Sequence, residues 1–546
     1  MAKIIQEIFF EPPIVIARLG GSTTPLAAYS WAISPDPRND DDTVIIPDWS
    51  FDILPDGSLS PFKPDSIRFR DGDLIRPTCP FIEVWVRMGE PGSDRTSWSE
   101  DPLTEALLRA AGGDRSALTF TVDARNAKAA RRVPNPDLVY GLFPSVHVPG
   151  DRHDPVALFA VNPPAITRPM IPPGRHIPLG TVQVIRPRPN PSTPQGWPDT
   201  IDLDVIRLRF TPGRGEFYGP RQAANPTRES PVPAVKPENA FLDSGAGWFN
   251  SLGEGGGFIE PSDTFDFFAV GRAAHSLGVV DDTCEARIHV ELKLAGAAAP
   301  LLSAHANVLV GPPDFAPDRR PFLSIADDLN DRSADADARN AQLQGADLDR
   351  WVEDLFERAY ETVSLMNVDF WRSTRGIRRL APGKLGSAIA GDAVAPRDQA
   401  MGSRDKLRAA DIQIEAPSND HPLPLAERAR DRHRSISDVN TLKDLVFANP
   451  NRLEELVRGP FESEADEDGD RTTMRMPPFM RHSNANPLTI VGWQYDLLMR
   501  WAAGVGASPP LVARAEPSQP AAGAGELKPM SDAASLRQAQ VLRRSG

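Results

Sequence analysis

The chain has 546 residues, 40% of them apolar and 25% charged, which is the composition of a globular protein with more than one domain. Its formal net charge of −14 disfavours phosphate backbones and anionic lipid heads, so neither nucleic acid nor a membrane is expected as a partner. The 56 prolines interrupt helices and central strands, and they predict many loops and short strands.

The sequence carries no signal for export or for membrane insertion. No apolar run approaches the roughly 18 residues of a membrane helix, and the apolar stretch within Met1–Phe10 is too short for a secretory signal. We therefore expect a soluble, cytoplasmic protein. Its two cysteines, Cys79 and Cys284, are expected to be reduced and not bonded to each other, because the cytosol keeps thiols reduced.

Residues 1–340 predict a large, mostly antiparallel β part. The apolar run Ile14–Ala17 ends at a pair of glycines, as a buried strand does before a tight turn. The run Phe81–Val86 is apolar at nearly every position, which indicates a strand covered on both faces. One helix is expected here, over residues 99–111 with Ser99 as its cap. Further strands are expected at 201–210 (with a bulge at Ile206), 287–294 and 306–310.

Residues 341–504 predict a mainly helical part. Apolar residues recur there at helical spacing, at Leu348, Trp351, Val352, Leu355, Phe356, Ala359, Tyr360 and Val363. Shorter helices are expected at 438–447 and 451–458. A last helix is expected from Pro487 to Ala503, capped by Asn486 and ended by Gly504. The fold class is thus β-rich α+β, with an irregular excursion at 373–435 and a linker with a short terminal helix at 505–546.

Candidate chemical motifs are weak throughout the chain. It has no nucleophile elbow, zinc-binding helix, phosphate loop or paired-cysteine motif. His147 and His153 are six residues apart in a proline-bounded loop, a spacing that gives little support to a metal site. The glycine run 253–257 lacks a following helix, and the acidic run 466–470 lacks the spacing of a calcium loop. We therefore predict no metal site and no cofactor, and the catalytic residues stay unknown.

Arginine pairs and the two thiols also favour ordinary structural roles. The pairs Arg131–Arg132 and Arg378–Arg379 are expected to be solvated or ion-paired. Cys79 lies between prolines beside an apolar strand, which indicates a buried thiol. Two aspartates precede Cys284, and their charges are expected to raise its pKa.

Four segments, taken together and in order, resemble the cysteine tryptophylquinone oxidases, the family of lysine ε-oxidase and glycine oxidase. They are IVIARLGGS at 14–22, DDTCEARIHVELKL at 281–294, ANVLVGPPDFAP at 306–317, and the region from Met474 to Gly504 with its Pro487-Leu488-Thr489, Gln494-Tyr495 and Trp501–Gly504. The resemblance implies an oxidase in which a cysteine and a tryptophan downstream of the last segment cross-link to form a quinone. That quinone captures the substrate amine as a Schiff base.

This chain departs from the family pattern after Gly504. Residues 505–546 contain neither cysteine nor tryptophan, so we expect no quinone. The resulting hypothesis is a quinone-free homologue that acts as a binding, scaffold or partner protein, with a protein partner or a second copy of itself. The alternative is an amine or amino-acid oxidoreductase completed by another chain or using a different cofactor.

Overall fold

The computed structural model describes residues 3–33, 43–126, 142–162, 170–188, 193–198, 201–219, 235–242, 279–295, 300–313, 343–364, 439–449 and 490–507, with isolated positions between 320 and 331 and between 453 and 460. These residues fall into two compact units. Unit 1 comprises the described residues up to 30 and from 46 to 313; unit 2 comprises those of 31–45 and those from 320 onward.

Unit 1 contains a six-stranded sheet in the order β1-β9-β15-β14-β13, with β10 also paired to β9. All its ladders are antiparallel. Its strands are β1 (Ile4–Glu11), β9 (Phe81–Gly89), β10 (Ser99–Pro102), β13 (Val156–Val161), β14 (His176–Val184) and β15 (Arg207–Pro212).

A second sheet of unit 1 has five strands in the order β12-β11-β18-β19-β2. Its ladders are antiparallel except the parallel pairing of β19 with β2. Its strands are β2 (Ile14–Arg18), β11 (Leu118–Arg125), β12 (Val146–Pro149), β18 (Glu285–Lys293) and β19 (Leu301–Gly311). Pro12 and Pro13 separate β1 from β2, so the chain passes from the first sheet to the second at this pair.

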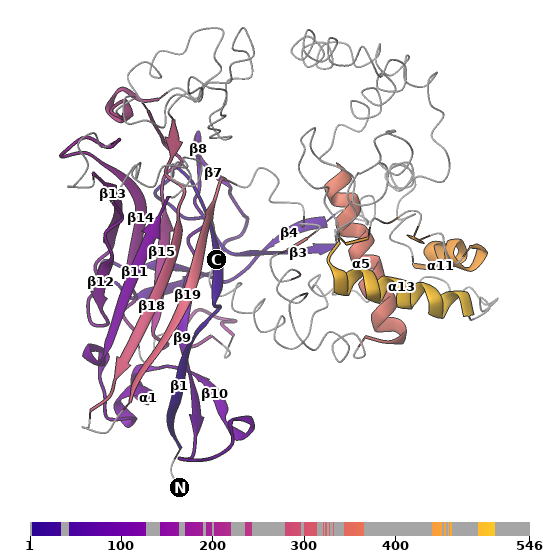
Figure 1. Cartoon of the computed structure of the whole chain (residues 1–546), viewed down its shortest axis with the longest axis horizontal. Helices are drawn as coiled ribbons and strands as arrows, with labels where there is room; N and C mark the ends of the chain where they lie inside the picture. The colour runs from indigo at the N-terminus through magenta and orange to yellow at the C-terminus, as the bar shows by residue number, and fades with distance from the viewer. Residues whose placement is uncertain are drawn as a thin grey trace, which may run out of the picture. The chain divides into compact units, whose positions relative to one another are not determined.

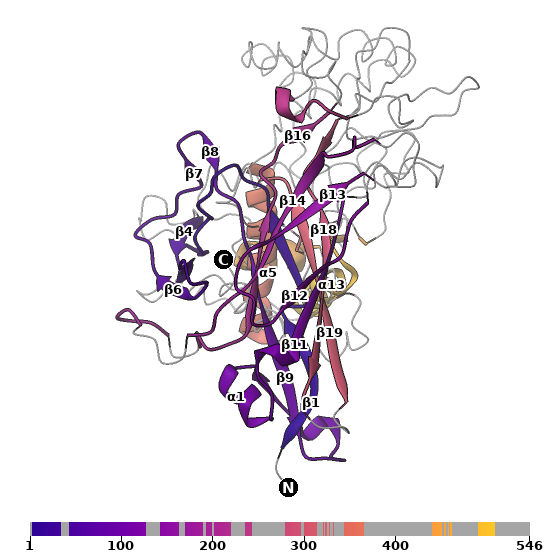
Figure 2. The same ribbon diagram turned by 90° about the vertical axis from the view of Figure 1, so that its left-hand side faces the viewer.

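The two sheets enclose one hydrophobic core, and Figures 1 and 2 show their long strands running together. Alternate residues of each strand point inward, as the two-residue period of a strand requires. The inward residues exposed by 2% or less include Phe10, Ile82, Val84, Phe120, Ile288 and Val308. The prediction of a strand-rich part with antiparallel sheets is confirmed.

Short ladders join β3 (Tyr29–Ile33) to β4 (Thr43–Pro47), β5 (Ser50–Ile53) to β6 (Leu59–Phe62), β7 (Arg70–Asp71) to β8 (Leu74–Ile75), and β16 (Phe217–Tyr218) to β17 (Val280–Asp281). The β5–β6 hairpin contributes to a small second core of unit 1, whose buried members are Phe51, Leu59, Phe81, Ile185 and Leu203. Phe81 belongs to this small core and its neighbour Ile82 to the large one. The strand β9 is therefore covered on both faces, as predicted.

Two elements of unit 1 differ from the sequence prediction. Residues 99–102 form β10 against β9, and the helix α1 (Glu105–Ala110) begins later. The hydroxyl of Thr104, not that of Ser99, caps α1 by accepting from the amide of Leu107.

The expected strand at 201–210 is likewise shorter, because β15 begins only at Arg207. The carboxylate of Asp202 accepts a hydrogen bond from the amide of Asp204 in a turn, and between this turn and β15 Val205 makes only an isolated bridge to Thr104.

The described part of unit 2 contains three helices, α5 (Gly345–Ser364), α11 (Val439–Ala448) and α13 (Gly492–Ala507). Their apolar faces share a core that includes Trp351, Val352, Leu355, Val446 and Leu497. The predicted stripe from Leu348 onward thus lies on a real helix, and its described members from Trp351 to Phe356 are buried. The side chains of Ala359, Tyr360 and Val363 lie outside the described residues.

The last helix, α13, has other boundaries than those predicted. It begins at Gly492, where Asp331 accepts from the amide of Trp493 and Gln494 accepts from that of Val491. These side chains satisfy amides of the first turn, so Asn486 is not the cap. The helix also continues past Gly504, because one glycine costs only about 1 kcal/mol in a helix and the following Val505 packs on the core.

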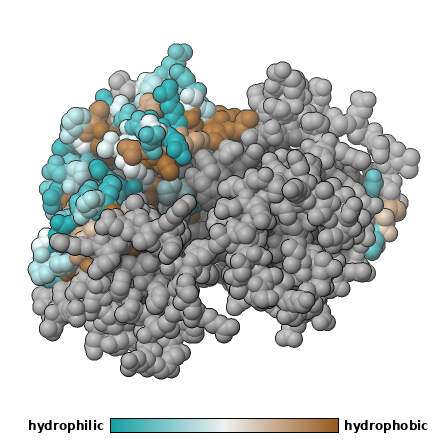
Figure 3. Space-filling view, turned by 90° about the horizontal axis from the view of Figure 1, so that it is seen from above, coloured by the Kyte–Doolittle hydropathy of each residue, from teal (hydrophilic) through white to brown (hydrophobic). Residues whose placement is uncertain are grey.

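The excursion 373–435, the runs 253–257 and 466–470, both arginine pairs and residues 508–546 lie outside the described residues. None of the described helices is long and apolar enough to span a bilayer. In the view of Figure 3 the described surface carries hydrophilic and hydrophobic residues side by side.

Candidate functional site

A pocket of about 440 Å³ opens in unit 1 on the outer face of the six-stranded sheet. Its lining comes from the two strands β9 and β15, the β5–β6 hairpin, and the loops on either side of them. The lining residues are Thr24, Pro25, Leu26, Ala27, Ser50, Phe51, Asp52, Phe62, Pro64, Asp65, Ser66, Arg68, Arg76, Cys79, Phe81 and Arg209. Its volume lies within the range of about 300–1,000 Å³ that is usual for small-molecule sites.

Strand register places a cation and an aromatic ring at the sheet side of this pocket. Arg209 on β15 lies directly opposite Phe81 on β9. Their neighbours Leu208 and Ile82 are fully buried in the core between the sheets. Because side chains alternate along a strand, Arg209 and Phe81 project from the opposite, outer face.

The aromatic side of the pocket is a rigid cluster of rings. Phe51 meets Phe81 edge-on, with ring centres 5.5 Å apart and planes at 84°. It also meets Trp197 edge-on at 5.8 Å. The guanidinium of Arg207 lies 5.6 Å from the centre of the Phe51 ring. Edge-to-face packing of this kind fixes each ring, so the apolar wall is preformed.

Three arginines give the pocket its charge. Arg76 and Arg209 are half-buried, and Arg68 is exposed, as are the two lining aspartates Asp52 and Asp65. The Nε atoms of Arg76 and Arg209 are buried and have no hydrogen-bond partner within the described structure. A buried N–H without an acceptor costs roughly 1–3 kcal/mol, and both arginines with such a donor line the pocket.

The pocket also contains the thiol of Cys79, which is buried and bonded to the backbone. Its Sγ lies 3.8 Å from the carbonyl oxygen of Pro77 and donates to it. Burial raises the pKa of Cys79 above its ordinary value, and the nearby Arg209 guanidinium only partly offsets this effect. The group is a protonated thiol at neutral pH, and a poor nucleophile.

Cys284 is an equally unreactive thiol in the core of unit 1. Its Sγ donates to the carbonyl oxygen of Leu179 at 3.4 Å. Burial raises the pKa of Cys284 to about 12, and the carboxylate of Asp282 adds to the effect. The sequence attributed this shift to the preceding aspartates, whereas burial is the larger cause. Both cysteines are free, as expected.

His147 and His153 do not come together. His153 is buried, and its Nδ1 donates to the carbonyl oxygen of Val184 at 3.1 Å while its Nε2 accepts from Arg115 at 2.6 Å. Burial lowers the pKa of His153, which keeps the ring neutral for this arrangement. His147 lies on the outer face of the five-stranded sheet, where its Nδ1 is 3.0 Å from the hydroxyl of Thr121. No group of three or more His, Cys, Asp or Glu side chains within the described residues is arranged to hold a metal ion.

The aspartate pair that begins the DDTCEARIHVELKL segment has a structural role. Asp282 is 1% exposed, and its carboxylate accepts from the amides of Arg214 and Gly215. The side-chain amide of Asn126 donates to the carbonyl oxygen of Asp281. The pair thus holds the start of β18 to the turn that follows β15.

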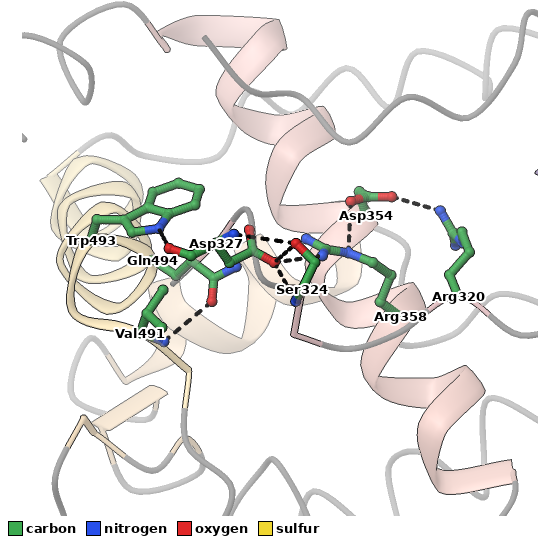
Figure 4. A network of polar contacts seen from close by, with 8 residues as sticks. All are labelled: Arg320, Ser324, Asp327, Asp354, Arg358, Val491, Trp493 and Gln494. Atoms are coloured by element: carbon green, nitrogen blue, oxygen red, sulfur yellow. Dashed lines mark hydrogen bonds and ion pairs between the residues drawn. The ribbon is translucent and has the colours of Figure 1, made fainter. Parts of the chain in front are cut away.

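Unit 2 has a buried polar network, shown in Figure 4, that ties the residues near 320–331 to two helices. Asp354 of α5 accepts from Arg320 at 2.6 Å and pairs with Arg358 at 3.0 Å. Asp327 pairs with Arg358 at 3.5 Å, and its carbonyl oxygen accepts from the indole of Trp493 on α13. The positive charges of the two arginines and the negative charges of the two aspartates compensate one another. The network therefore connects parts of unit 2 and is not a binding site.

The sequence alone did not predict the pocket. Arg76, Arg209 and Phe51 come from separate segments, and only the β9–β15 pairing and the β5–β6 hairpin bring them together. One signal was present, because Arg207 and Arg209 alternate with apolar residues. The alternation does not show that the β5–β6 hairpin covers the face on which these arginines lie.

Three of the four segments used for the family resemblance become neighbours in space. They form β2, β19 and β18, which are adjacent in the five-stranded sheet. No protein-family model matches the chain, and no curated protein matches its sequence.

Among solved structures, the chain is similar to the L-lysine ε-oxidase of Marinomonas mediterranea. The crystal structure of the oxidase's Schiff-base intermediate with L-lysine matches at 15% identity and a TM-score of 0.33. The match covers 64% of this chain and 44% of the oxidase chain. A second structure of the oxidase matches at 14% identity and a TM-score of 0.33, over 66% and 46%. The chain therefore spans less than half of that protein's length. The likeness is distant and structural, and it assigns no activity to this chain.

Proposed function

We propose that this chain is a binding protein without a protein-derived quinone, and that unit 1 holds a small organic anion in the three-arginine pocket. The observation that carries the proposal is the pair of buried, unpartnered Nε donors of Arg76 and Arg209 beside a wall of phenylalanines. Two guanidinium groups with free donors are suited to a carboxylate, which accepts two parallel N–H bonds from one guanidinium.

The chemistry of the wall limits the rest of the ligand. Phe51, Phe62 and Phe81 offer ring faces and edges, and Leu26 adds an aliphatic side chain. Such a wall favours a flat or aliphatic body over a second charged group. The ligand class is therefore a small monocarboxylic acid with an apolar body. The exposed Asp52 and Asp65 disfavour a second negative charge near the opening.

Calorimetric titration of the full chain with benzoate and with benzamide tests the proposal. The two probes have nearly the same shape, and only benzoate carries the carboxylate. We expect benzoate to bind at least about tenfold more tightly, because charge-assisted hydrogen bonds are roughly twice as strong as neutral ones. Equal affinities would show that the arginines do not recognise the anion.

Substitutions of the two half-buried pocket arginines test whether benzoate binds in this pocket. Arg76→Gln and Arg209→Gln should each weaken benzoate binding by about tenfold or more, since each removes a cation that faces the pocket. Arg70→Gln is the matched control, because Arg70 lies on β7 in the same region, is exposed and does not line the pocket. Benzoate binding that is unchanged in both pocket variants would contradict the proposal.

The absence of a quinone is a separate part of the proposal. A tryptophylquinone needs a thioether from a cysteine sulfur, and the chain has only two cysteines. Both sulfurs are buried and hydrogen-bonded to backbone carbonyls, and the described residues that line the pocket with Cys79 include no tryptophan. We expect the intact mass of the unmodified chain, no visible absorbance band, and no hydrogen peroxide release with lysine or glycine. A coloured protein with added oxygen mass would favour the oxidoreductase alternative.

A further inference from the structure

A row of four polar side chains crosses the outer face of the five-stranded sheet. Thr121 on β11 lies directly opposite His147 on β12 and directly opposite His289 on β18. His289 lies in turn directly opposite His305 on β19. The row therefore reads His147, Thr121, His289 and His305 across four adjacent strands.

Strand alternation places this row on the side of the sheet away from the core. The residues next to His289 along β18, Ile288 and Val290, are fully buried, as is Ala306 next to His305. His289 is half-buried and His305 is exposed. Neither imidazole takes part in a hydrogen bond or an ion pair within the described part of the chain, whereas His147 is engaged by Thr121.

We propose that His289 and His305 form a two-imidazole site for a divalent transition metal such as Zn²⁺, with water completing the coordination shell. Directly opposite residues on adjacent antiparallel strands have their Cβ atoms about 4.5–5.5 Å apart. Two nitrogens on one tetrahedral ion, at about 2.0–2.1 Å each, lie roughly 3.3 Å from each other. Imidazoles that lean together from such a strand pair span this distance without backbone movement.

The ligand atoms determine which metal ions the site binds. Imidazole suits Zn²⁺, Cu²⁺ and Ni²⁺, whereas Mg²⁺ and Ca²⁺ prefer oxygen ligands. Glu291 and Arg287 each lie two residues from His289 on the same strand and the same face, and their opposite charges offset each other beside the site. Two protein ligands leave most of the shell to water, so the site is open and binds more weakly than a closed structural zinc site.

The same row contains an internal control. His147 has the same side-chain type on the same face, but Thr121 stands between it and His289. With adjacent strands about 4.8 Å apart, His147 lies roughly 9–10 Å from His289 across the sheet, too far to share one ion. Loss of His147 should therefore leave the site intact.

Calorimetric titration of the chelator-treated full chain with ZnCl₂ tests the proposal. We expect saturable Zn²⁺ binding that weakens by at least about tenfold in His289→Asn and in His305→Asn and stays unchanged in His147→Asn. MgCl₂ should give no binding. Because a metal that bridges two strands binds the folded state, Zn²⁺ should also raise the unfolding temperature of the wild type and of His147→Asn, and not of the other two variants.

The variants keep the test decisive, because the altered side chains lie on the outer face and do not belong to the core. Circular dichroism without metal should show the same unfolding temperature for all four proteins. Zn²⁺ binding of equal strength in all of them would mean that the ion sits on other groups and would overturn the proposal, as would the absence of binding to the wild type. If His147→Asn weakened Zn²⁺ binding as much as His305→Asn does, the assignment of the site to His289 and His305 would also be overturned.

Discussion

The guanidinium of Arg209 lies 5.8 Å from the centre of the Phe81 ring, and the two residues face each other in register on β15 and β9. An aromatic face attracts a cation, so this contact holds the charge against an apolar wall, with no carboxylate partner among the described residues. The arrangement leaves the Nε donor of Arg209 unpaired within the described structure. The same contact therefore helps to fix the side chain of an arginine that lines the pocket.

Replacing Arg209 by lysine tests whether the shape of the guanidinium matters as well as its charge. Lysine keeps the charge but loses the planar fork and the stacking on Phe81. We expect Arg209→Lys to bind benzoate about tenfold more weakly than the wild type, with little change in unfolding temperature. Titration calorimetry measures the first and differential scanning calorimetry the second. Full affinity in the lysine variant would mean that charge alone is recognised.

The buried ion pair of Glu83 and Arg207 gives a stability prediction. The two groups are 2.9 Å apart with side chains only 3% and 1% exposed, and the indole of Trp85 also donates to Glu83. Removing one charge leaves the other buried and uncompensated, so Glu83→Gln should lower the free energy of unfolding of unit 1 by about 3–5 kcal/mol.

The double variant Glu83→Leu/Arg207→Met is the matched comparison for this pair. It removes both charges together and should cost clearly less than the single variant, because no lone charge stays buried. Urea unfolding followed by circular dichroism compares the two. A double variant that is as unstable as the single one would show that packing, not charge, accounts for the loss.

The sequence predicted the elements whose patterns are local. The alternation in β18, the nearly all-apolar run in β9 and the helical stripe from Leu348 are each patterns of residues close together in the sequence, and the structure contains all three. Prediction from the sequence failed where a residue far away in the chain sets the start of a helix. Asp331 lies more than 150 positions before α13, yet it caps that helix, and no pattern near Asn486 signals this.

The candidate site shows the same limit. Arg76, Phe51 and Arg209 have no motif in common, and their chemistry follows only from the pairing of β15 with β9 and from the hairpin above it. The histidine row is similar, because His147, His289 and His305 acquire a shared face through strand register alone. Register depends on contacts between distant segments, which a single sequence specifies only weakly.

The contact of Trp351 with Trp493 tests the core of unit 2. The rings of these residues, on α5 and α13, have centres 5.8 Å apart, and Trp351 is 1% exposed. Trp351→Ala should lower the free energy of unfolding of unit 2 by about 3–5 kcal/mol, because it removes a large buried side chain and leaves a cavity. Arg350→Ala, at the exposed neighbouring position, should change it by within about 0.5 kcal/mol. Similar losses in urea unfolding for the two variants would show that this stripe is not the core.

Asp282 carries a prediction about pH, since two opposing effects act on its carboxylate. Burial raises the pKa of Asp282 to about 6, whereas hydrogen bonds from the amides of Arg214 and Gly215 pull it down. A carboxyl group with a pKa higher in the folded than in the unfolded state binds its proton more tightly when folded. The folded state is therefore favoured at low pH, and that advantage is lost as pH rises from about 4 through about 6.

Comparing the wild type with Asp282→Asn isolates the pH-dependent contribution of Asp282 to the free energy of unfolding. Asparagine does not titrate, and the contributions of the other titrating groups cancel when the two free energies are subtracted. The wild-type free energy of unfolding, minus that of Asp282→Asn, should fall by about 2 kcal/mol between about pH 4 and about pH 7. Urea unfolding at several pH values, away from the isoelectric point near 5.2, measures the difference. A difference that rises with pH would mean that the backbone amides outweigh burial, so that Asp282 is held as a carboxylate to lock the turn after β15 to β18.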